Sequence, residues 1–163
     1  MTSPQTPERT ATPESTVSLR IAVLGAGKMG GILVQAFLRS GLFPREHVAA
    51  TVAHEARAIT LSTQFGIPVT TDNLNAAEAA DIILLGVKPQ QMHDVIRGIA
   101  PALRPGKLLI SFAASVKTSA IEEAAGCNIS VIRAMPNTPA MLGGGISAIC
   151  RGKFVTDQQL ALA

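Results

Sequence analysis

Two patterns of apolar and polar positions alternate along the chain from Leu19 onward. Short continuous apolar runs predict strands that are buried on both faces of a sheet. Stretches with apolar residues three or four positions apart predict helices that bury one face. Strands and helices that alternate in this way indicate an α/β domain with a mainly parallel sheet. The expected strands lie near 19–24, 47–53, 67–70, 81–86, 107–112, 129–134 and 146–150, and the expected helices near 28–40, 55–65, 74–79, 89–103 and 117–126.

Two of these helices carry additional local signals. In the stretch 117–126, Ser119 is followed three residues later by Glu122, a spacing typical of a capping box near the start of a helix. In the stretch 28–40, several residues are spaced to share one face, and we expect that face to meet the sheet. These residues are Met29, Ile32, Leu33, Ala36, Phe37 and Ser40.

The two ends of the chain differ from its middle. Residues 1–18 are rich in Thr, Pro and Ser and show no periodicity, which predicts a disordered tail before a single domain over 19–155. Thr156 and Gln159 have the spacing of another capping box, so a helix is expected to begin in 156–163. No Gly or Pro follows as a stop signal before Ala163. We therefore expect a helix that is cut short, with a second domain missing beyond it.

The most informative motif follows the first predicted strand. Gly25, Gly27 and Gly30 form a G-x-G-x-x-G turn between an apolar run and an amphipathic stretch. Gly25 permits a tight turn, Gly27 lets the backbone approach a pyrophosphate, and Gly30 lets the helix lie close to the strand. The helix N-terminus offers free N–H groups to phosphates. The order of elements predicts a Rossmann-like, doubly wound fold that binds a dinucleotide; the alternative is a glycine-rich turn without a ligand.

The ends of the second and fourth strands suggest how that dinucleotide is held. An acidic residue usually follows the second strand and accepts from the ribose of NAD. Here Ala53 and His54 take that place, Glu55 falls inside the helix start, and His54 and Arg57 could meet a 2′-phosphate. NADP(H) is therefore favoured over NAD(H); the alternative is that His54 and Arg57 belong to a solvated helix end. Lys88 follows the fourth strand and could contact phosphate or ribose, or be an ordinary surface lysine.

The fifth and sixth strands also end in candidate segments. Small residues over 112–115 leave room for a flat ring, although tight packing alone could explain them. The loop 133–140 places Asn137 and Thr138 between two prolines that fix its backbone. A rigid polar loop at the ligand edge is a functional candidate, and a purely structural turn is the alternative.

Composition excludes several other classes of function. Aromatic residues make up only 3% of the chain and the basic residues are scattered, so no nucleic-acid partner is expected. Cys127 and Cys150 form neither a disulfide framework nor a metal-spaced cluster. No apolar run is long enough for a membrane helix, and no signal region opens the chain. These features predict a cytoplasmic protein without a metal or a membrane partner.

Taken together, the motifs resemble those of pyrroline-5-carboxylate reductases from about Leu19 to Ala163. The segment Arg133-Ala134-Met135-Pro136-Asn137-Thr138-Pro139-Ala140 is the most specific of them. The resemblance implies that Asn73 also contacts the cofactor, and it adds no firm catalytic residue beyond the candidates Asn137 and Thr138. The expected cofactor-binding residues are Leu24, Gly25, Ala26, Gly27, Lys28, Met29, Gly30, His54, Arg57, Asn73, Gly86, Val87, Lys88, Pro89, Phe112, Ala113 and Ala114.

The resemblance implies hydride transfer from NADP(H), with NAD(H) as the alternative cofactor, to the C=N bond of a cyclic imine acid, which gives proline. It also implies a helical C-terminal domain that forms a homo-oligomer and carries a Gly-Ser-Gly-Pro and a Ser-Pro-Gly-Gly motif, neither of which occurs here. The chain alone is therefore expected to lack activity. Two alternatives remain: a related deazaflavin-dependent NADP oxidoreductase, against which the loop 133–140 argues, and a non-catalytic nucleotide-sensing module.

Overall fold

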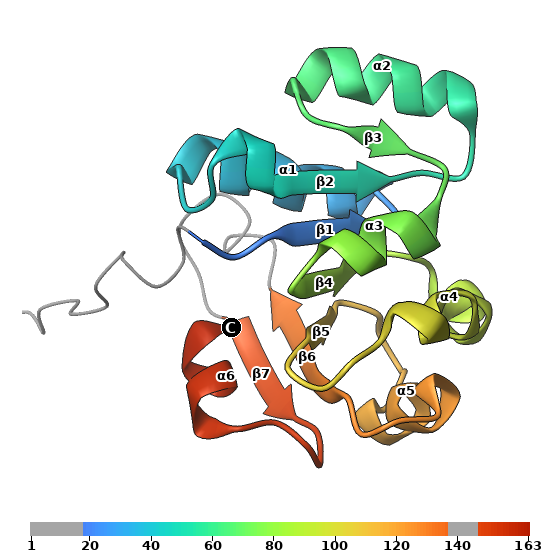
Figure 1. Cartoon of the computed structure of the whole chain (residues 1–163), viewed down its shortest axis with the longest axis vertical. Helices are drawn as coiled ribbons and strands as arrows, with labels where there is room; N and C mark the ends of the chain where they lie inside the picture. Colours follow the sequence, from blue (N-terminus) through green and yellow to red (C-terminus); the bar gives the residue numbers. More distant parts are fainter. Residues whose placement is uncertain (1–17, 137–146) are drawn as a thin grey trace, which may run out of the picture.

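A computed structural model describes residues 18–136 and 147–163, which form a three-layer α/β domain around one seven-stranded sheet (Figure 1). The strand order is β3-β2-β1-β4-β5-β6-β7. Neighbouring strands from β3 to β6 are parallel, and β7 is antiparallel to β6. The predicted doubly wound, mainly parallel sheet is therefore confirmed. The strands are β1 (Ile21–Leu24), β2 (Val48–Thr51), β3 (Val69–Thr70), β4 (Ile82–Leu85), β5 (Leu108–Ser111), β6 (Ser130–Pro136) and β7 (Ser147–Arg151).

Helices cover both faces of the sheet and create two separate apolar clusters. One cluster joins the sheet to α1 (Lys28–Ser40), α2 (Glu55–Phe65) and α6 (Asp157–Leu162). The other joins it to α3 (Asn73–Ala79), α4 (Met92–Ile99) and α5 (Thr118–Ala125). Side chains of β1 alternate between the two clusters, as expected for a central strand. Short 3₁₀ turns complete the fold as η2 (Arg45–His47), η3 (Pro89–Gln91) and η4 (Ala100–Ala102).

The topology determines where a ligand can be held. Successive strands run outward from β1 to β3 on one side and from β4 to β6 on the other. The strand order therefore reverses between β1 and β4, and doubly wound sheets bind ligands outside the carboxyl ends of strands at such a point. The segments after Leu24 and Leu85 meet there.

Three local expectations about helices were wrong. The helix expected over 89–103 is divided into η3, α4 and η4. The N-cap of α5 is Lys117, so Ser119 lies inside the helix and the expected capping box is absent. Glu122 instead accepts a hydrogen bond from the backbone N–H of Lys153 at 2.7 Å. In α1 the buried residues are Gly30 and Val34, whereas Ala36 and Ser40 of the expected face are exposed.

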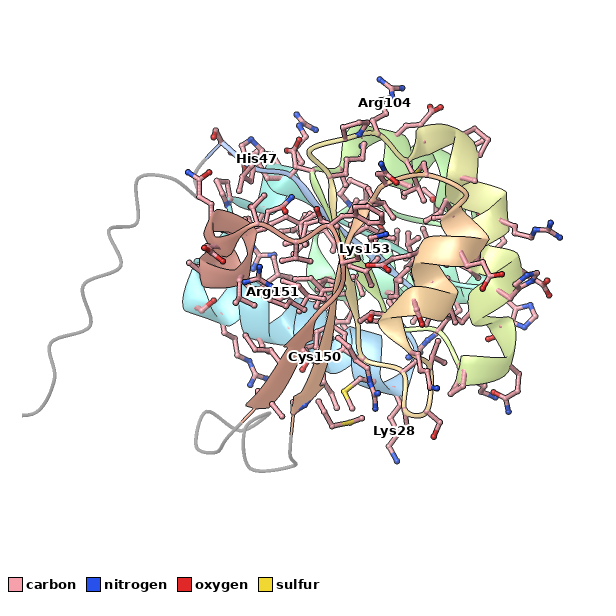
Figure 2. The ribbon with its side chains drawn as sticks, turned by 90° about the horizontal axis from the view of Figure 1, so that it is seen from below. Lys28, His47, Arg104, Cys150, Arg151 and Lys153 are labelled. Carbon is pink, nitrogen blue, oxygen red and sulfur yellow. The ribbon has the colours of Figure 1, made fainter. Side chains whose placement is uncertain are left out.

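The C-terminal elements show the expected helix start. Thr156 and Gln159 form the predicted capping box at the beginning of α6. Arg151 Nη1 lies 2.7 Å from Asp157 Oδ1 and joins β7 to α6; Arg151 is labelled in Figure 2. The side chains of β7 are exposed along its whole length. Within residues 18–136 and 147–163, no helix has the length and apolar character needed to cross a membrane.

Candidate functional site

Three glycines allow the turn after β1, the start of α1 and the end of β4 to approach one another closely. Gly25 has φ +85°, and a Cβ there would lie 2.7 Å from Val87 Cγ1. A Cβ on Gly30 would overlap the carbonyl oxygen of Gly25, and a Cβ on Gly86 would lie 2.9 Å from the same oxygen. Gly30 therefore has the role expected from the sequence, and Gly86 is a third glycine that the same contact requires.

Gly27 differs from these three because its surroundings are open. No heavy atom lies within 4 Å of the place that a Cβ on Gly27 would occupy. Gly27 is the N-cap of α1, with no side-chain cap and no acidic residue in the first turn. The first N–H groups of the helix are consequently free to donate to an anion that approaches over Gly27. This is the environment that a pyrophosphate requires.

Thr51, at the end of β2, holds the glycine turn in place. Its backbone oxygen accepts from Ala26 N–H at 2.7 Å, and its Oγ1 accepts from Gly25 N–H at 3.2 Å. The hydroxyl in turn donates to Asn73 Oδ1 at 2.6 Å. Thr51 is buried, and sequence reasoning missed it because β2 was expected to end at Ala53, two residues later. Its polar side chain inside an apolar run was the available signal.

These segments surround a cavity of about 320 Å³ at the carboxyl edge of the sheet, which we call the carboxyl-edge cavity. It brings together nine of the residues expected from the sequence, namely Gly25, Ala26, Gly27, His54, Arg57, Asn73, Gly86, Val87 and Lys88. The remaining lining residues were not expected: Thr51, Val52, Ala53, Thr71, Gln91 and Val95.

Five other expected residues lie beside the carboxyl-edge cavity without lining it. Leu24 is fully buried beneath the turn, and Gly30 is buried within α1. Lys28 is exposed, and its side chain extends away from the body of the molecule (Figure 2). Met29 is half-buried in the first turn of α1, and Pro89 is exposed at the start of η3.

The two residues expected from the sequence to meet a 2′-phosphate lie just beyond the end of β2. His54 is the N-cap of α2, and both His54 and Arg57 are exposed and line the carboxyl-edge cavity. Glu55 lies in the first turn of α2, as expected, and its Oε2 accepts from Thr71 Oγ1 at 3.4 Å. This contact engages the carboxylate closest to the place where an NAD-specific acid would stand.

The segment after β5 is separate from this cavity. Phe112 is half-buried and packs against the cluster under α1 and α2, Ala113 is buried, and Ala114 is exposed. Ser115 has φ +64°, an uncommon conformation for a residue with a side chain. The candidates Asn137 and Thr138 lie outside the described residues, so their arrangement relative to these groups stays a prediction.

A second cavity of about 200 Å³, the amino-edge cavity, lies between α3 and the starts of β1, β2 and β3. Ala22, Ala49, Ala76 and Ala79 form much of its wall, and His47 contributes a buried Nδ1 without a hydrogen-bond partner among the described residues. None of the residues expected to bind the cofactor lines it. No three His, Cys, Asp or Glu residues of 18–136 and 147–163 are grouped to hold a metal ion.

Comparison with known proteins agrees with this geometry. Residues 20–115, which contain the whole carboxyl-edge cavity, match the family model described as NADP oxidoreductase, coenzyme F420-dependent. The chain belongs to this family. A curated pyrroline-5-carboxylate reductase of Vibrio alginolyticus is 38% identical over 144 residues, which are 88% of this chain and 53% of the relative. The chain thus spans about half the length of the curated relatives it matches.

Solved structures of the same kind of enzyme have the same fold. A pyrroline-5-carboxylate reductase from Coxiella burnetii superposes with a TM-score of 0.82 at 28% identity, covering 89% of this chain and 54% of that one. A pyrroline carboxylate reductase from Plasmodium falciparum, solved with NADP bound, gives 0.77 at 25% identity over 89% and 52%. The resemblance to this enzyme group that the motifs predicted is therefore confirmed.

Proposed function

We propose that the chain is the cofactor-binding part of a pyrroline-5-carboxylate reductase and that the carboxyl-edge cavity binds NADP(H). The observation that carries the proposal is the meeting of four segments at one cavity: the glycine turn that leads into α1, the end of β2, the residues between β3 and α3, and the Gly86–Lys88 segment. This edge of the sheet, beside the reversal of strand order, is where such folds bind nucleotides. The NADP-bound relative from Plasmodium falciparum supports the same cofactor.

Each segment has a distinct task in this proposal. The open backbone at Gly27 and the free N–H groups of α1 would hold the pyrophosphate. Lys88 would meet a phosphate or ribose oxygen, and His54 and Arg57 would meet the 2′-phosphate. When bound, the reduced nicotinamide supplies the hydride that adds to the C=N carbon of the imine. The chain's own contribution is to bind and align the cofactor, and such alignment can supply a large share of a rate enhancement.

The complete reaction is proposed to need more than residues 1–163. Because the chain spans about half the length of its relatives, we infer that a further C-terminal domain supplies imine-binding groups and makes the protein a homo-oligomer. Asn137 and Thr138 are proposed to face the substrate from the cofactor side. The protein is proposed to act in the cytoplasm. The 163-residue chain alone should bind NADPH without reducing the imine at a useful rate.

Gly27→Val tests the proposed binding mode. The new side chain has open space, so the fold should persist while the branched group blocks the approach of the pyrophosphate. Titration of NADPH, followed by its fluorescence, should show a loss of at least about a hundredfold, roughly 2.7 kcal/mol. Gly98→Val is the matched control because Gly98 also has open surroundings and lies in α4, outside the lining residues. Equal NADPH affinity in the parent and Gly27→Val would contradict the proposal.

An activity assay separates the proposed reaction from its alternatives. NADPH oxidation should be measured with the imine on the 163-residue chain and on a protein of the relatives' length. Turnover only in the longer protein supports the proposal, and comparable turnover in both would place the catalytic groups within the shorter chain. The description of the matching family favours one second candidate, an oxidoreductase that passes hydride between NADP and coenzyme F420. Turnover with F420 and none with the imine would select it, and turnover with neither would favour a nucleotide-sensing module.

A further inference from the structure

The hydroxyl of Thr51 has a single hydrogen, and its neighbours determine where that hydrogen points. Gly25 N–H donates to Thr51 Oγ1 at 3.2 Å, so the oxygen acts as an acceptor toward the glycine turn. Asn73 Oδ1 lies 2.6 Å from the same oxygen and accepts the hydroxyl hydrogen. Hydrogen bonding thus runs in one direction, from the Gly25 backbone through Thr51 to Asn73.

This direction fixes the orientation of the Asn73 carboxamide. A carboxamide has an acceptor oxygen and an NH₂ group with two donor hydrogens. Because Oδ1 is engaged by Thr51, the NH₂ group occupies the opposite side of the carboxamide. Asn73 is half-buried and lines the carboxyl-edge cavity, and its Nδ2 makes no hydrogen bond to another described residue. The donors are therefore available to a molecule in that cavity.

The position of Asn73 indicates which part of a dinucleotide would meet those donors. Asn73 is the first residue of α3 and shares the cavity wall with Thr71, which follows β3, and with His54 and Arg57, which follow β2. These residues lie on the β2–β3 side of the glycine turn, where His54 and Arg57 are proposed to hold the 2′-phosphate of the adenosine half. The partner of Asn73 is then a ribose or phosphate oxygen of that half.

We propose that Thr51 is a positioning residue for the cofactor, which acts by turning the Asn73 NH₂ group toward an oxygen of the adenosine half and by tying it to the glycine turn. The inference rests on the proposed NADP(H) binding. Thr51 should therefore affect cofactor affinity even in variants that remain folded. Asn73 should act as a hydrogen-bond donor to the cofactor.

The role of Asn73 as a hydrogen-bond donor is tested first, with Asn73→Ala and Asn73→Asp. Asn73→Ala removes the donor, and NADPH affinity should fall by about tenfold, the effect of one hydrogen bond to a phosphate or hydroxyl oxygen. Asn73→Asp keeps an acceptor for Thr51 but turns an anionic oxygen toward the ligand oxygen, so it should bind NADPH more weakly than Asn73→Ala. Parent-like affinity of Asn73→Asp would show that the ligand is a donor at this position and would overturn the proposal.

The dependence on Thr51 is tested with Thr51→Val and Thr51→Ser. Thr51→Val keeps the shape and removes the hydroxyl, so NADPH affinity should fall by about tenfold, and Thr51→Ser should restore it to within about twofold. Thr63→Val is the matched control because Thr63 is exposed on α2 and bonds only its own helix, through Ile59 O. Thermal unfolding of each variant is followed so that affinities are compared well below the unfolding temperature.

Three results overturn the inference: unchanged affinity in folded Thr51→Val, a failure of folded Thr51→Ser to restore it, or losses from Thr51→Val and Asn73→Ala that simply add in the double variant. A smaller cost of Thr51→Val in the Asn73→Ala background is expected, because the two residues act together. Should Thr51→Val fail to fold, the Thr51→Ser and Asn73→Asp variants decide.

The parent chain separates this inference from the proposed function. If the parent does not bind NADPH, the proposed function fails and this inference fails with it. If the parent binds and the Thr51 variants are unaffected, only this inference fails. Adenosine 2′,5′-bisphosphate serves as a probe of the adenosine half, and Thr51→Val should weaken it by the same factor as NADPH. A loss confined to NADPH would place the contact elsewhere on the cofactor and overturn the assignment.

Discussion

The two cavities of the molecule lie on the same sheet and differ in what their walls can offer. The carboxyl-edge cavity is bordered by a glycine turn, the N-cap of α1, the imidazole of His54 and the cations of Arg57 and Lys88. The amino-edge cavity is bordered by several alanines and by polar residues that include Arg20, Glu46 and Asn75. The last carbonyl groups of α3 are already engaged, because Lys107 Nζ donates to Ala77 O, Glu78 O and Ala80 O.

The comparison shows that the presence of a cavity says less about ligand binding than the main-chain groups around the cavity. An anion is stabilised by free N–H groups and by cations, and the carboxyl-edge cavity combines the uncapped N-terminus of α1 with Arg57 and Lys88. The amino-edge cavity is lined by the anion Glu46 as well as by the cation Arg20. Four substitutions test this contrast, beginning with the largest expected effect.

The closest backbone contact beside the carboxyl-edge cavity should be the most sensitive to change. Gly30→Ala places a Cβ against the Gly25 carbonyl, which cannot move without breaking the turn, so the unfolding free energy should fall by at least about 3 kcal/mol. Gly31→Ala is the matched control, since its Cβ would lie 3.7 Å from Ala26 O and alanine favours a helix. Denaturant unfolding measures both variants. Equal stability of the two would contradict the close approach of α1 to the turn.

Arg57→Gln should reveal the preference between the two cofactors. A charge-assisted contact to the 2′-phosphate is worth about 1.5–3 kcal/mol, so NADPH affinity should fall by about tenfold or more while NADH affinity changes little. Calorimetry with both cofactors measures the two affinities. Arg39→Gln, an equal charge change at an exposed site on α1, controls for the overall field. Equal losses for NADPH and NADH would show that Arg57 does not contact the 2′-phosphate.

Glu55→Gln should have a smaller effect of the opposite sign. Removing a negative charge beside the proposed 2′-phosphate should tighten NADPH by about 0.2–1 kcal/mol, and the gain should shrink at high salt. Titrations of NADPH at low and high ionic strength check both statements. If NADH binding weakens markedly instead, Glu55 accepts from the ribose and the preference for NADP is wrong.

The amino-edge cavity should tolerate being filled. Ala79→Leu extends a side chain from α3 into a space that no proposed ligand group requires. NADPH affinity should stay unchanged, and the unfolding free energy should change by no more than about 0.5 kcal/mol. The same fluorescence and denaturant measurements apply. A loss of NADPH affinity in a fully folded Ala79→Leu protein would remove the contrast between the two cavities.

Much of this architecture was predictable because local signals and the fold agree. Apolar runs gave the strands of the parallel sheet, since a strand covered on both faces must be apolar throughout. The glycine spacing predicted the close contacts at Gly25 and Gly30, because a side chain at either position would overlap a neighbouring group. Thr156 and Gln159 predicted the start of α6 for a similarly local reason.

The remainder depended on contacts between distant residues. Ser119 and Glu122 have the spacing of a capping box, yet Glu122 accepts a hydrogen bond from the backbone N–H of Lys153, which follows β7. Thr51 is functional in our proposal only because Gly25 and Asn73 lie on either side of it. Nothing in a linear pattern reports such pairings. The glycine turn, which the backbone forms, was therefore predictable from the sequence. The contacts between side chains of separate segments, such as Thr51 and Asn73, were not.

The meeting of Gly25, Gly30 and Gly86 has a consequence for the order of folding events. The glycine turn lies between β1 and α1, but Gly86 and Val87, which pack against it, follow β4. In the sequence β2, α2, β3 and α3 stand between the turn and β4. Joining segments so far apart in sequence requires a long loop to close, which local contacts cannot offset beforehand. Nucleotide affinity should therefore emerge late in refolding, once β4 has added to the sheet. The onset of NADPH fluorescence enhancement would then time the closure of the central sheet.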